Sequence, residues 1–375
     1  MSKAINTGSL ESNPFADYHK RALDKIVRRA HRDKVGYFHA TTEGTYLQVD
    51  KWFWTTGFWP GLMRLALNES TDEVCFNAAK EVEDEIFSLL RTDDFYELHH
   101  DVGFQFLPTS VLRYKQTGSC EAKRRGIIAA QLLAARFNVA SNVIEAWNVP
   151  NRRGCSIIDS MMNIPLLFWA SETTGDKRYY NCAVRHIESV LKHFIRDDFT
   201  VHHIVQFDQT SGEYVKALGG QGYSADSVWS RGQSWMIYGL AIASRYTGNQ
   251  HYKDIARIIA DRFLDLNGPH GVPPWDFSVP ESHLAPRDSS SAAIVACGLI
   301  ALGELGDYRA RSQAENIIMQ LSQEVACFED CQDGLLLRAT SDKPNEVHVS
   351  DSLIYGDYFY FEALQKLSGI GPHCW

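Results

Sequence analysis

The sequence lacks the features that identify several large classes of protein. Among its 375 residues no stretch approaches ~18 uninterrupted apolar residues, so we expect no membrane-spanning helix. Residues 1–18 lack a basic segment followed by an apolar run, and we therefore expect no secretory signal. The net charge of −9 disfavours nucleic acid or an anionic membrane as a partner.

Common catalytic and metal-binding motifs are also absent. There is no Walker loop, GxSxG motif, dinucleotide fingerprint or HExxH zinc motif. The eight cysteines include no CxxC pair, and neither a second pair nor a nearby histidine completes a zinc site around Cys327 and Cys331. Free thiols are typical of a reducing compartment, so we expect a cytoplasmic protein.

The sequence does contain a helical hairpin that is repeated along the chain. Each repeat has an apolar stretch of helical period, a short turn that usually contains glycine, and a second helical stretch. Glycine ends helices readily because it enters the left-handed region without a Cβ clash. We predict first helices at 61–67, 102–114, 159–171, 229–246, 290–305 and 353–367, and second helices at 73–90, 121–137, 177–194, 252–266 and 310–328.

The number of these helices predicts a closed ring. Five second helices follow six first helices, and an amphipathic helix at 17–32, joined by a connection at 33–51, can supply the sixth. Six inner and six outer antiparallel helices make an all-α (α/α)6 barrel. An open solenoid needs polar end caps, whereas the last repeat is strongly apolar and aromatic. We therefore expect a loose segment at 1–16 and one barrel domain at 17–375, and the sequence leaves a homo-oligomer open.

Unusual polar residues gather where the first helices begin. In such a barrel the inner helices point the same way, so one face collects six positive dipole ends. Asp101 and Asp159 open the second and third inner helices. Each of them alone is most simply an N-cap, but together, among apolar neighbours, they form a candidate acid/base pair.

Aromatic and basic residues at the same face also have two interpretations. Trp54, Trp229 and Trp235 can belong to the core or can stack on sugar rings. Arg231 can bind a carboxylate through two hydrogen bonds or can pair with a capping Asp.

Two histidine pairs, 99–100 and 202–203, could suggest a metal site with Asp101. Neighbouring side chains diverge along the backbone, so such a pair rarely chelates one ion. We favour a pair with one hydrogen-bonded and one exposed histidine, and we expect no bound metal.

Five separated motifs carry a family resemblance. They are His-His-Asp-Val-Gly-Phe at 99–104, the run 157–170 that begins Ile-Ile-Asp, Trp-Ser-Arg-Gly-Gln-Ser-Trp at 229–235, 275–277 with 287–290, and Tyr-Gly-Asp-Tyr at 355–358. Together they resemble the unsaturated glucuronyl hydrolases, glycoside hydrolase family 88, from about residue 52 to residue 367. The resemblance implies an (α/α)6 barrel with Asp159 as general acid/base and Asp101 as the second carboxylate. It also implies a substrate pocket lined by Trp54, His100, Trp147, His203, Gln221, Trp229, Arg231 and Trp235.

The chemistry of that family explains these residue types. Its substrates carry the C4=C5 double bond that polysaccharide lyases leave in a terminal uronate. An acid protonates C4, water adds at C5, and the hemiketal opens and expels the rest of the oligosaccharide. One carboxyl that alternates between acid and base suffices, so we expect no metal or organic cofactor. The loop 219–222 departs from the family pattern, since it reads Gly-Gly-Gln-Gly where a histidine often precedes Gln-Gly.

The expected substrate is an unsaturated disaccharide derived from a glycosaminoglycan, but other functions stay open. The related unsaturated rhamnogalacturonyl hydrolases use the same chemistry on pectin fragments. A sugar epimerase on the same fold would use paired histidines as acid and base. A sugar-binding protein without catalysis is a further alternative. The motifs at 99–104 and 157–159 favour the glucuronyl group.

Overall fold

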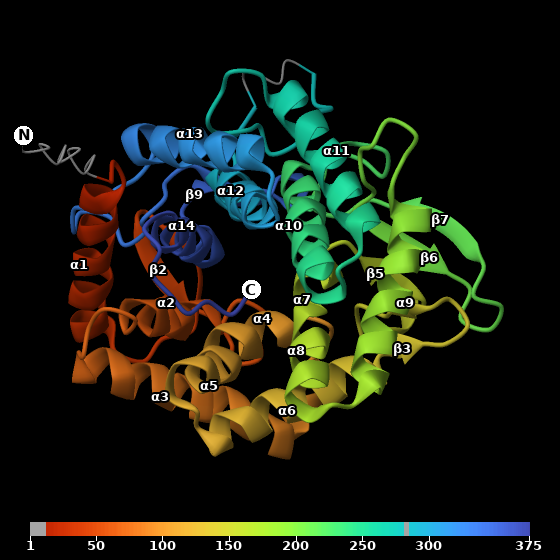
Figure 1. Ribbon diagram of the computed structural model, residues 1–375, viewed down its shortest axis with the longest axis horizontal. Helices are drawn as coiled ribbons and strands as arrows, with labels where there is room; N and C mark the ends of the chain where they lie inside the picture. Colours follow the sequence, from red (N-terminus) through yellow and green to blue (C-terminus); the bar gives the residue numbers. More distant parts are fainter. Residues whose placement is uncertain (1–12, 281–284) are drawn as a thin grey trace, which may run out of the picture.

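The computed structural model describes residues 13–280 and 285–375, and its helices form two concentric rings (Figure 1). The inner segments are α2 (Phe58–Ala66), α4 (Val102–Phe106) with α5 (Leu112–Thr117), α7 (Ser160–Asn163) with α8 (Pro165–Thr174), α10 (Ser230–Thr247), α12 (Ser289–Glu304) and α14 (Ile354–Leu367). The outer helices are α1 (Ala16–Asp33), α3 (Glu73–Ser88), α6 (Cys120–Ala135), α9 (Lys177–Phe194), α11 (Gln250–Asn267) and α13 (Tyr308–Glu324). Because α14 packs on α2 and α1 packs on both, the ring is closed, and the expected (α/α)6 barrel is confirmed.

Burial distinguishes the two rings. Every residue of α14 is buried, and so is every residue of α12 from Ser289 to Leu302. An outer helix such as α11 buries only one stripe, which includes Tyr252, Ile259 and Phe263. Inner helices such as α12 and α14 are therefore buried on all sides, whereas an outer helix such as α11 is amphipathic.

The turns between helices behave as their sequences predict. Gly118, Gly175 and Gly248 follow α5, α8 and α10 in the left-handed region, with φ of 69°, 77° and 69°. The next outer helix then begins with a side-chain cap. Asp72, Ser119, Asp176, Asn249 and Asp307 each accept a hydrogen bond from a backbone N–H in the first turn that follows.

Two inner helices are less regular than the sequence suggests. A π-helical segment, η3 (Leu107–Val111), separates α4 from α5. The third inner helix is interrupted between α7 and α8, where Pro165 lacks the N–H that a continuous helix needs. Apolar periodicity alone does not reveal such local changes of pitch.

Short antiparallel strands lie in the loops between helices, mainly at the end of the barrel where the inner helices begin. They form the hairpins β1 (Phe38–Thr42) with β2 (Thr45–Gln48), β3 (Phe137–Asn138) with β4 (Val143–Ile144) and β8 (Ala339–Asp342) with β9 (Val347–Asp351), and a sheet of β5 (Cys155–Ile157), β6 (Ile204–Phe207) and β7 (Tyr214–Leu218). Short 3-10 turns are η1 (Leu89–Arg91), η2 (Asp93–Glu97), η4 (Pro150–Arg152) and η5 (Lys343–Asn345). The connection expected at 33–51 thus contains the β1–β2 hairpin.

The segment 372–375 fills the middle of the ring (Figure 1). The Trp375 indole N–H donates to the Met162 carbonyl at 2.9 Å, and its ring lies 5.2 Å from that of Phe359. Asn68, just after α2, donates to the Pro372 carbonyl at 3.0 Å. The segment therefore enters from the carboxyl ends of the inner helices and closes that end of the barrel.

Residues 1–12 of the expected loose segment lie outside the described residues, and the division into domains stays a prediction. Within residues 13–280 and 285–375, no helix combines the length and the apolar composition that crossing a membrane requires.

Candidate active site

A cleft of about 670 Å³ opens at the face where the inner helices begin. Seven of the ten residues predicted for the site line it: Trp54, His100, Asp101, Trp147, Asp159, His203 and Gln221. The remaining lining residues are His99, Val149, Arg152, Ile157, Ile204, Gly219, Gly220, Gly222, Tyr223, Ser224, Asp342, Pro344 and Asn345. The β5–β6–β7 sheet and the β8–β9 hairpin thus contribute walls around the helix termini.

Asp101 and Asp159 lie at the N-terminal ends of α4 and α7, but neither caps its helix. Neither side chain accepts a hydrogen bond from the backbone of the following turn. By contrast, Asp288 at the start of α12 does accept the Ser290 N–H, at 3.1 Å. The N-cap interpretation, the simplest one for a lone Asp, therefore does not account for either cleft carboxyl.

Asn163 joins the two helices that carry these carboxyls. Its amide Nδ2 donates to Asp101 Oδ1 and to the Asp159 carbonyl, both at 3.1 Å, while its Oδ1 accepts the Phe104 N–H at 2.9 Å. The helices approach this closely because residue 103 is glycine, since a Cβ there would lie 2.5 Å from Asn163 Oδ1. One buried amide thus links the Asp101 carboxyl to the backbone of Asp159.

Burial changes the acidity of both carboxyls. Removal from water raises the pKa of Asp159 to about 6, although the positive charge of Arg231 acts in the opposite direction. Burial, and then the negative charge of Asp159, raise the pKa of Asp101 well above its usual range. Burial thus favours the protonated form of both carboxyls, and with a pKa of about 6 Asp159 exchanges its proton readily near neutral pH.

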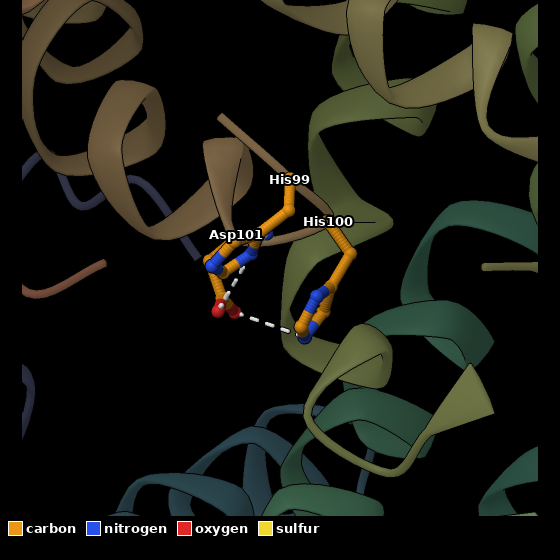
Figure 2. A group of neighbouring side chains, drawn as sticks. All are labelled: His99, His100 and Asp101. Carbon is orange, nitrogen blue, oxygen red and sulfur yellow. Dashed lines mark hydrogen bonds and ion pairs between the residues drawn. The ribbon is translucent and has the colours of Figure 1, made fainter. Parts of the chain in front are cut away.

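His99, His100 and Asp101 form a compact group (Figure 2). His99 Nδ1 lies 3.3 Å from Asp101 Oδ2, and His100 Nε2 lies 3.2 Å from Asp101 Oδ1. His100 Nδ1 donates to the Ala146 carbonyl at 2.9 Å, so its Nε2 carries a lone pair. Burial lowers the pKa of both histidines, that of His99 to about 4, so both rings are neutral at physiological pH.

The same three residues could offer ligands to a cation, since their ligand atoms lie within 4.8 Å of one another. Metals bind carboxylates in the ionised form, which the burial of Asp101 disfavours. The Nε2 lone pair of His100 has no hydrogen-bond partner among the described residues, so it is open to a donor on a ligand. The group therefore offers hydrogen-bonding atoms to a substrate, and burial favours its neutral form.

His203 lies beside Asp159 because β5 pairs with β6. The Ile158 N–H donates to the His203 carbonyl at 3.0 Å, which extends the pairing of the two strands. His203 Nδ1 accepts the Gln221 N–H at 3.2 Å, so the ring proton is on Nε2, 3.9 Å from Asp159 Oδ2. Among the described residues neither Nε2 nor Oδ2 has a hydrogen-bond partner, although both atoms are buried. Two unsatisfied polar atoms, a donor and a carboxyl oxygen, thus face one another in the cleft.

Trp229, Arg231 and Trp235, which were expected to line the pocket, lie behind its wall. Arg231 is 1% exposed, and Trp229 and Trp235 are also buried. Trp229 stacks between the His203 ring, with centroids 4.1 Å apart, and the Arg231 guanidinium at 4.6 Å. The three residues therefore support and polarise the side chains that line the cleft.

The hydrogen bonds of Arg231 are made to the protein. Its guanidinium donates to Asp288 Oδ2 at 2.5 Å and to the Thr340 and Ser341 carbonyls, each at 2.7 Å. This is the pairing with a capping Asp that the sequence left as one of two interpretations. Arg231 thereby ties strand β8 to the starts of α10 and α12.

Several residues of the cleft were not singled out from the sequence. Asn163 was quoted only within a motif, although a buried Asn four residues after Asp159 in an apolar run is a recognisable signal. Arg152 lies in a loop, and Asp342 lies in the β8–β9 hairpin, whose Asp-Lys-Pro-Asn turn could have been read from the sequence. Their place at the cleft depends on contacts between distant segments.

Comparison with known proteins gives a consistent result. The family model described as Glycosyl Hydrolase Family 88 matches residues 29–324. An unsaturated glucuronyl hydrolase from Bacillus sp. (strain GL1) is 33% identical over 333 residues, which cover 86% of this chain and 88% of that protein. An unsaturated chondroitin disaccharide hydrolase from Streptococcus pyogenes serotype M1 is 32% identical over 361 residues, 92% of this chain and 90% of that protein.

Solved structures agree with the sequence comparisons. The crystal structure of the unsaturated glucuronyl hydrolase from Bacillus sp. GL1 superposes with a TM-score of 0.91 at 30% identity, and the match covers 96% of this chain and 99% of that chain. The family expected from the five motifs is thus confirmed. The chain belongs to glycosyl hydrolase family 88, with the unsaturated glucuronyl hydrolases, and is a glycoside hydrolase.

Proposed function

We propose that this enzyme releases the terminal 4,5-unsaturated glucuronic acid from lyase-generated glycosaminoglycan oligosaccharides. The observation that carries the proposal is Asp159, a buried carboxyl with a pKa of about 6 whose Oδ2 faces the cleft and has no hydrogen-bond partner among the described residues. A carboxyl with this pKa can both give and take a proton near neutral pH. The similar proteins named for unsaturated glucuronyl and chondroitin disaccharide substrates support this substrate class.

The cleft offers polar groups of defined direction to a sugar. His203 presents an N–H donor, because its other ring nitrogen accepts the Gln221 N–H. His100 presents an acceptor, because its Nδ1 already donates to the backbone. Trp54 and Trp147 provide apolar surface for the sugar faces. Asp101, whose burial favours the protonated form, binds a hydroxyl and fixes the reacting sugar beside Asp159.

In the first step Asp159 gives its proton to C4 of the double bond. The positive charge that develops is shared between C5 and the ring oxygen, and Asp159 becomes a carboxylate. Asn163 holds the backbone of Asp159 in place during this change through its bond to the Asp159 carbonyl. The neutral side chains of His100 and His203 add no charge that opposes it.

In the second step water adds to C5, and the Asp159 carboxylate takes the proton that this water loses. The product is a hemiketal at C5. Its ring opens to a C5 ketone and leaves a hemiacetal at C1, which collapses to an aldehyde and releases the remaining saccharide as an alcohol. Asp159 regains the proton that it gave, so the cycle needs no other acid or base.

Arg231 and Trp235 act on this cycle through Asp159. The positive charge of Arg231 and the Trp235 N–H both lower the pKa of Asp159, against the larger effect of burial. We propose that Arg231 and Trp235 adjust the pKa of Asp159 and that, together with Trp229, they support the side chains that line the cleft.

We also place the enzyme in the cytoplasm. All eight cysteines are free thiols, and Cys75, Cys155, Cys297 and Cys374 are buried in an apolar interior. A reducing compartment preserves such thiols. A homo-oligomer stays a prediction.

The test uses paired saturated and unsaturated disaccharides of the same linkage in heavy water. We expect cleavage of the unsaturated sugar alone, with one deuterium delivered to one face of C4 and detected by early-time NMR. Cleavage of the saturated sugar, or a product without deuterium at C4, would mean an ordinary glycosidase and would overturn the mechanism.

A parallel panel separates the substrate alternatives. Unsaturated disaccharides from chondroitin, hyaluronan and heparin should be cleaved faster than an unsaturated rhamnogalacturonan disaccharide. The reverse order would assign the enzyme to pectin fragments while leaving the chemistry intact. Inversion of a sugar centre without release of a second saccharide would indicate an epimerase.

A further inference from the structure

Arg152 is a positive charge in the cleft that the proposed reaction does not use. It ends the 3-10 turn η4, just before β5, and its side chain lines the cleft. Among the described lining residues it is the only lysine or arginine. The guanidinium of Arg152 lies 5.4 Å from the centre of the Trp147 ring, so the cation stacks on an indole that also lines the cleft.

The Arg152 guanidinium forms no ion pair and no side-chain hydrogen bond within residues 13–280 and 285–375. Asp342, which also lines the cleft, already accepts from the Asn345 side chain at 2.8 Å, and among the described residues neither it nor Asp101 nor Asp159 forms an ion pair with Arg152. The five donors of the guanidinium are therefore available to a ligand.

The depth of Arg152 in the cleft indicates which part of the substrate it meets. Asp101 and Asp159 are 8% and 9% exposed and form the base, where the unsaturated uronate reacts. Val149, in the same loop as Arg152, is 47% exposed and lies at the rim, and Arg152 itself is half-buried. A saccharide attached to the uronate extends from the base toward this rim.

We propose that Arg152 is a specificity-determining residue that binds a sulfate ester on the leaving sugar. Trp147 contacts the apolar face of that sugar, while the planar guanidinium stacked on it donates two parallel hydrogen bonds to the sulfate. The enzyme thereby prefers unsaturated disaccharides whose leaving sugar is sulfated. This inference rests on the proposed function, because it assigns the second sugar of the same substrate.

The experiment compares three unsaturated disaccharides by steady-state kinetics: one unsulfated, one sulfated on the leaving sugar and one sulfated on the uronate. Arg152→Gln removes the charge, and Arg152→Lys retains the charge but not the planar fork. Arg153→Gln is the matched control, because the adjacent arginine is exposed and does not line the cleft. Thermal unfolding of each variant checks that the fold is retained.

We expect Arg152→Gln to lower the kcat/KM ratio of the leaving-sugar-sulfated to the unsulfated disaccharide by about tenfold or more, the size of a lost charge-assisted hydrogen bond. Arg152→Lys should lower it less, and Arg153→Gln should leave it at the wild-type value. Raising the ionic strength should reduce the wild-type ratio, because the rim is partly exposed.

Other outcomes overturn the inference. An equal loss on all three disaccharides would place Arg152 on the uronate carboxylate that they share, and a loss confined to the uronate-sulfated sugar would place it on that sulfate. An unchanged ratio would remove Arg152 from recognition. Failure of the wild-type enzyme to cleave any of the three is a different result, since it refutes the proposed function itself.

Discussion

Activity should fall as the pH rises through the pKa of Asp159. The mechanism requires the free enzyme to hold a proton on this carboxyl, and burial raises its pKa to about 6. A single ionisation with this pKa leaves about 10% of the enzyme protonated at pH 7 and about 1% at pH 8. We therefore expect kcat/KM to drop tenfold per pH unit above about pH 6.5.

The neighbouring histidines titrate below this interval. Burial lowers the pKa of His99 to about 4 and that of His203 to about 3, whereas it raises the pKa of Asp101 well above its usual range and so favours the neutral carboxyl. Asp101→Asn keeps a neutral polar group at this position, so it should lower the rate without moving the midpoint of the basic limb. This variant is therefore a control for the assignment to Asp159.

The assay follows the loss of the ultraviolet absorbance of the unsaturated uronate between pH 4.5 and pH 8.5, with substrate well below KM. Salt should move the midpoint little, because buried charges are poorly screened. A kcat/KM that stays level from pH 5 to pH 8 would refute the reasoning, as would a midpoint that Asp101→Asn displaces by a whole unit.

Three further predictions concern individual side chains. Asp159→Asn should reduce kcat by about 10²–10⁴ while leaving the urea-unfolding midpoint nearly unchanged, because Oδ2 has no protein partner to lose, and a loss below tenfold would contradict the acid/base assignment. Asn163→Ala should lower the free energy of unfolding by about 1–3 kcal/mol for each of the Asp101 and Phe104 groups that it leaves unpaired, and unaltered urea denaturation would argue against the bridge. Trp375→Ala should lower the same free energy by about 3–5 kcal/mol, since the ring is buried and hydrogen-bonded to Met162, and a shift below 1 kcal/mol would show that the far end of the barrel does not need this residue.

The sequence was sufficient to predict the ring of helices and the positions of the two carboxyls. Helical periodicity predicted the inner and outer helices, and the glycine turns predicted the direction in which each helix runs. Asp101 and Asp159 could therefore be placed at one face of the barrel. It was not sufficient for the strands. Within strand β1, for example, Ala40 forms a bridge with Leu353, a contact between opposite ends of the chain that no local pattern reveals.

The side chains behind the wall show a second limit of sequence reasoning. A motif identifies Arg231 and Trp235 as part of the site but not the direction in which they point. Arg231 turns toward Asp288 and the β8 carbonyls because three acceptors converge there, two of them from a strand more than a hundred residues away. Arg152 could not be found at all, since only the fold of the loop between Trp147 and β5 brings it to the cleft.

The closed far end of the barrel has a consequence for the order of events in turnover. Phe104 packs on Trp235 and on Trp375, with ring centroids 5.2 Å and 6.1 Å apart, and all three side chains are buried. We therefore expect the cleft to end at this aromatic floor and to admit only the end of a saccharide chain. Both products must leave by the entrance, the outer saccharide first and the uronate last. The freed uronate should accordingly compete with incoming substrate, whereas the outer saccharide should not.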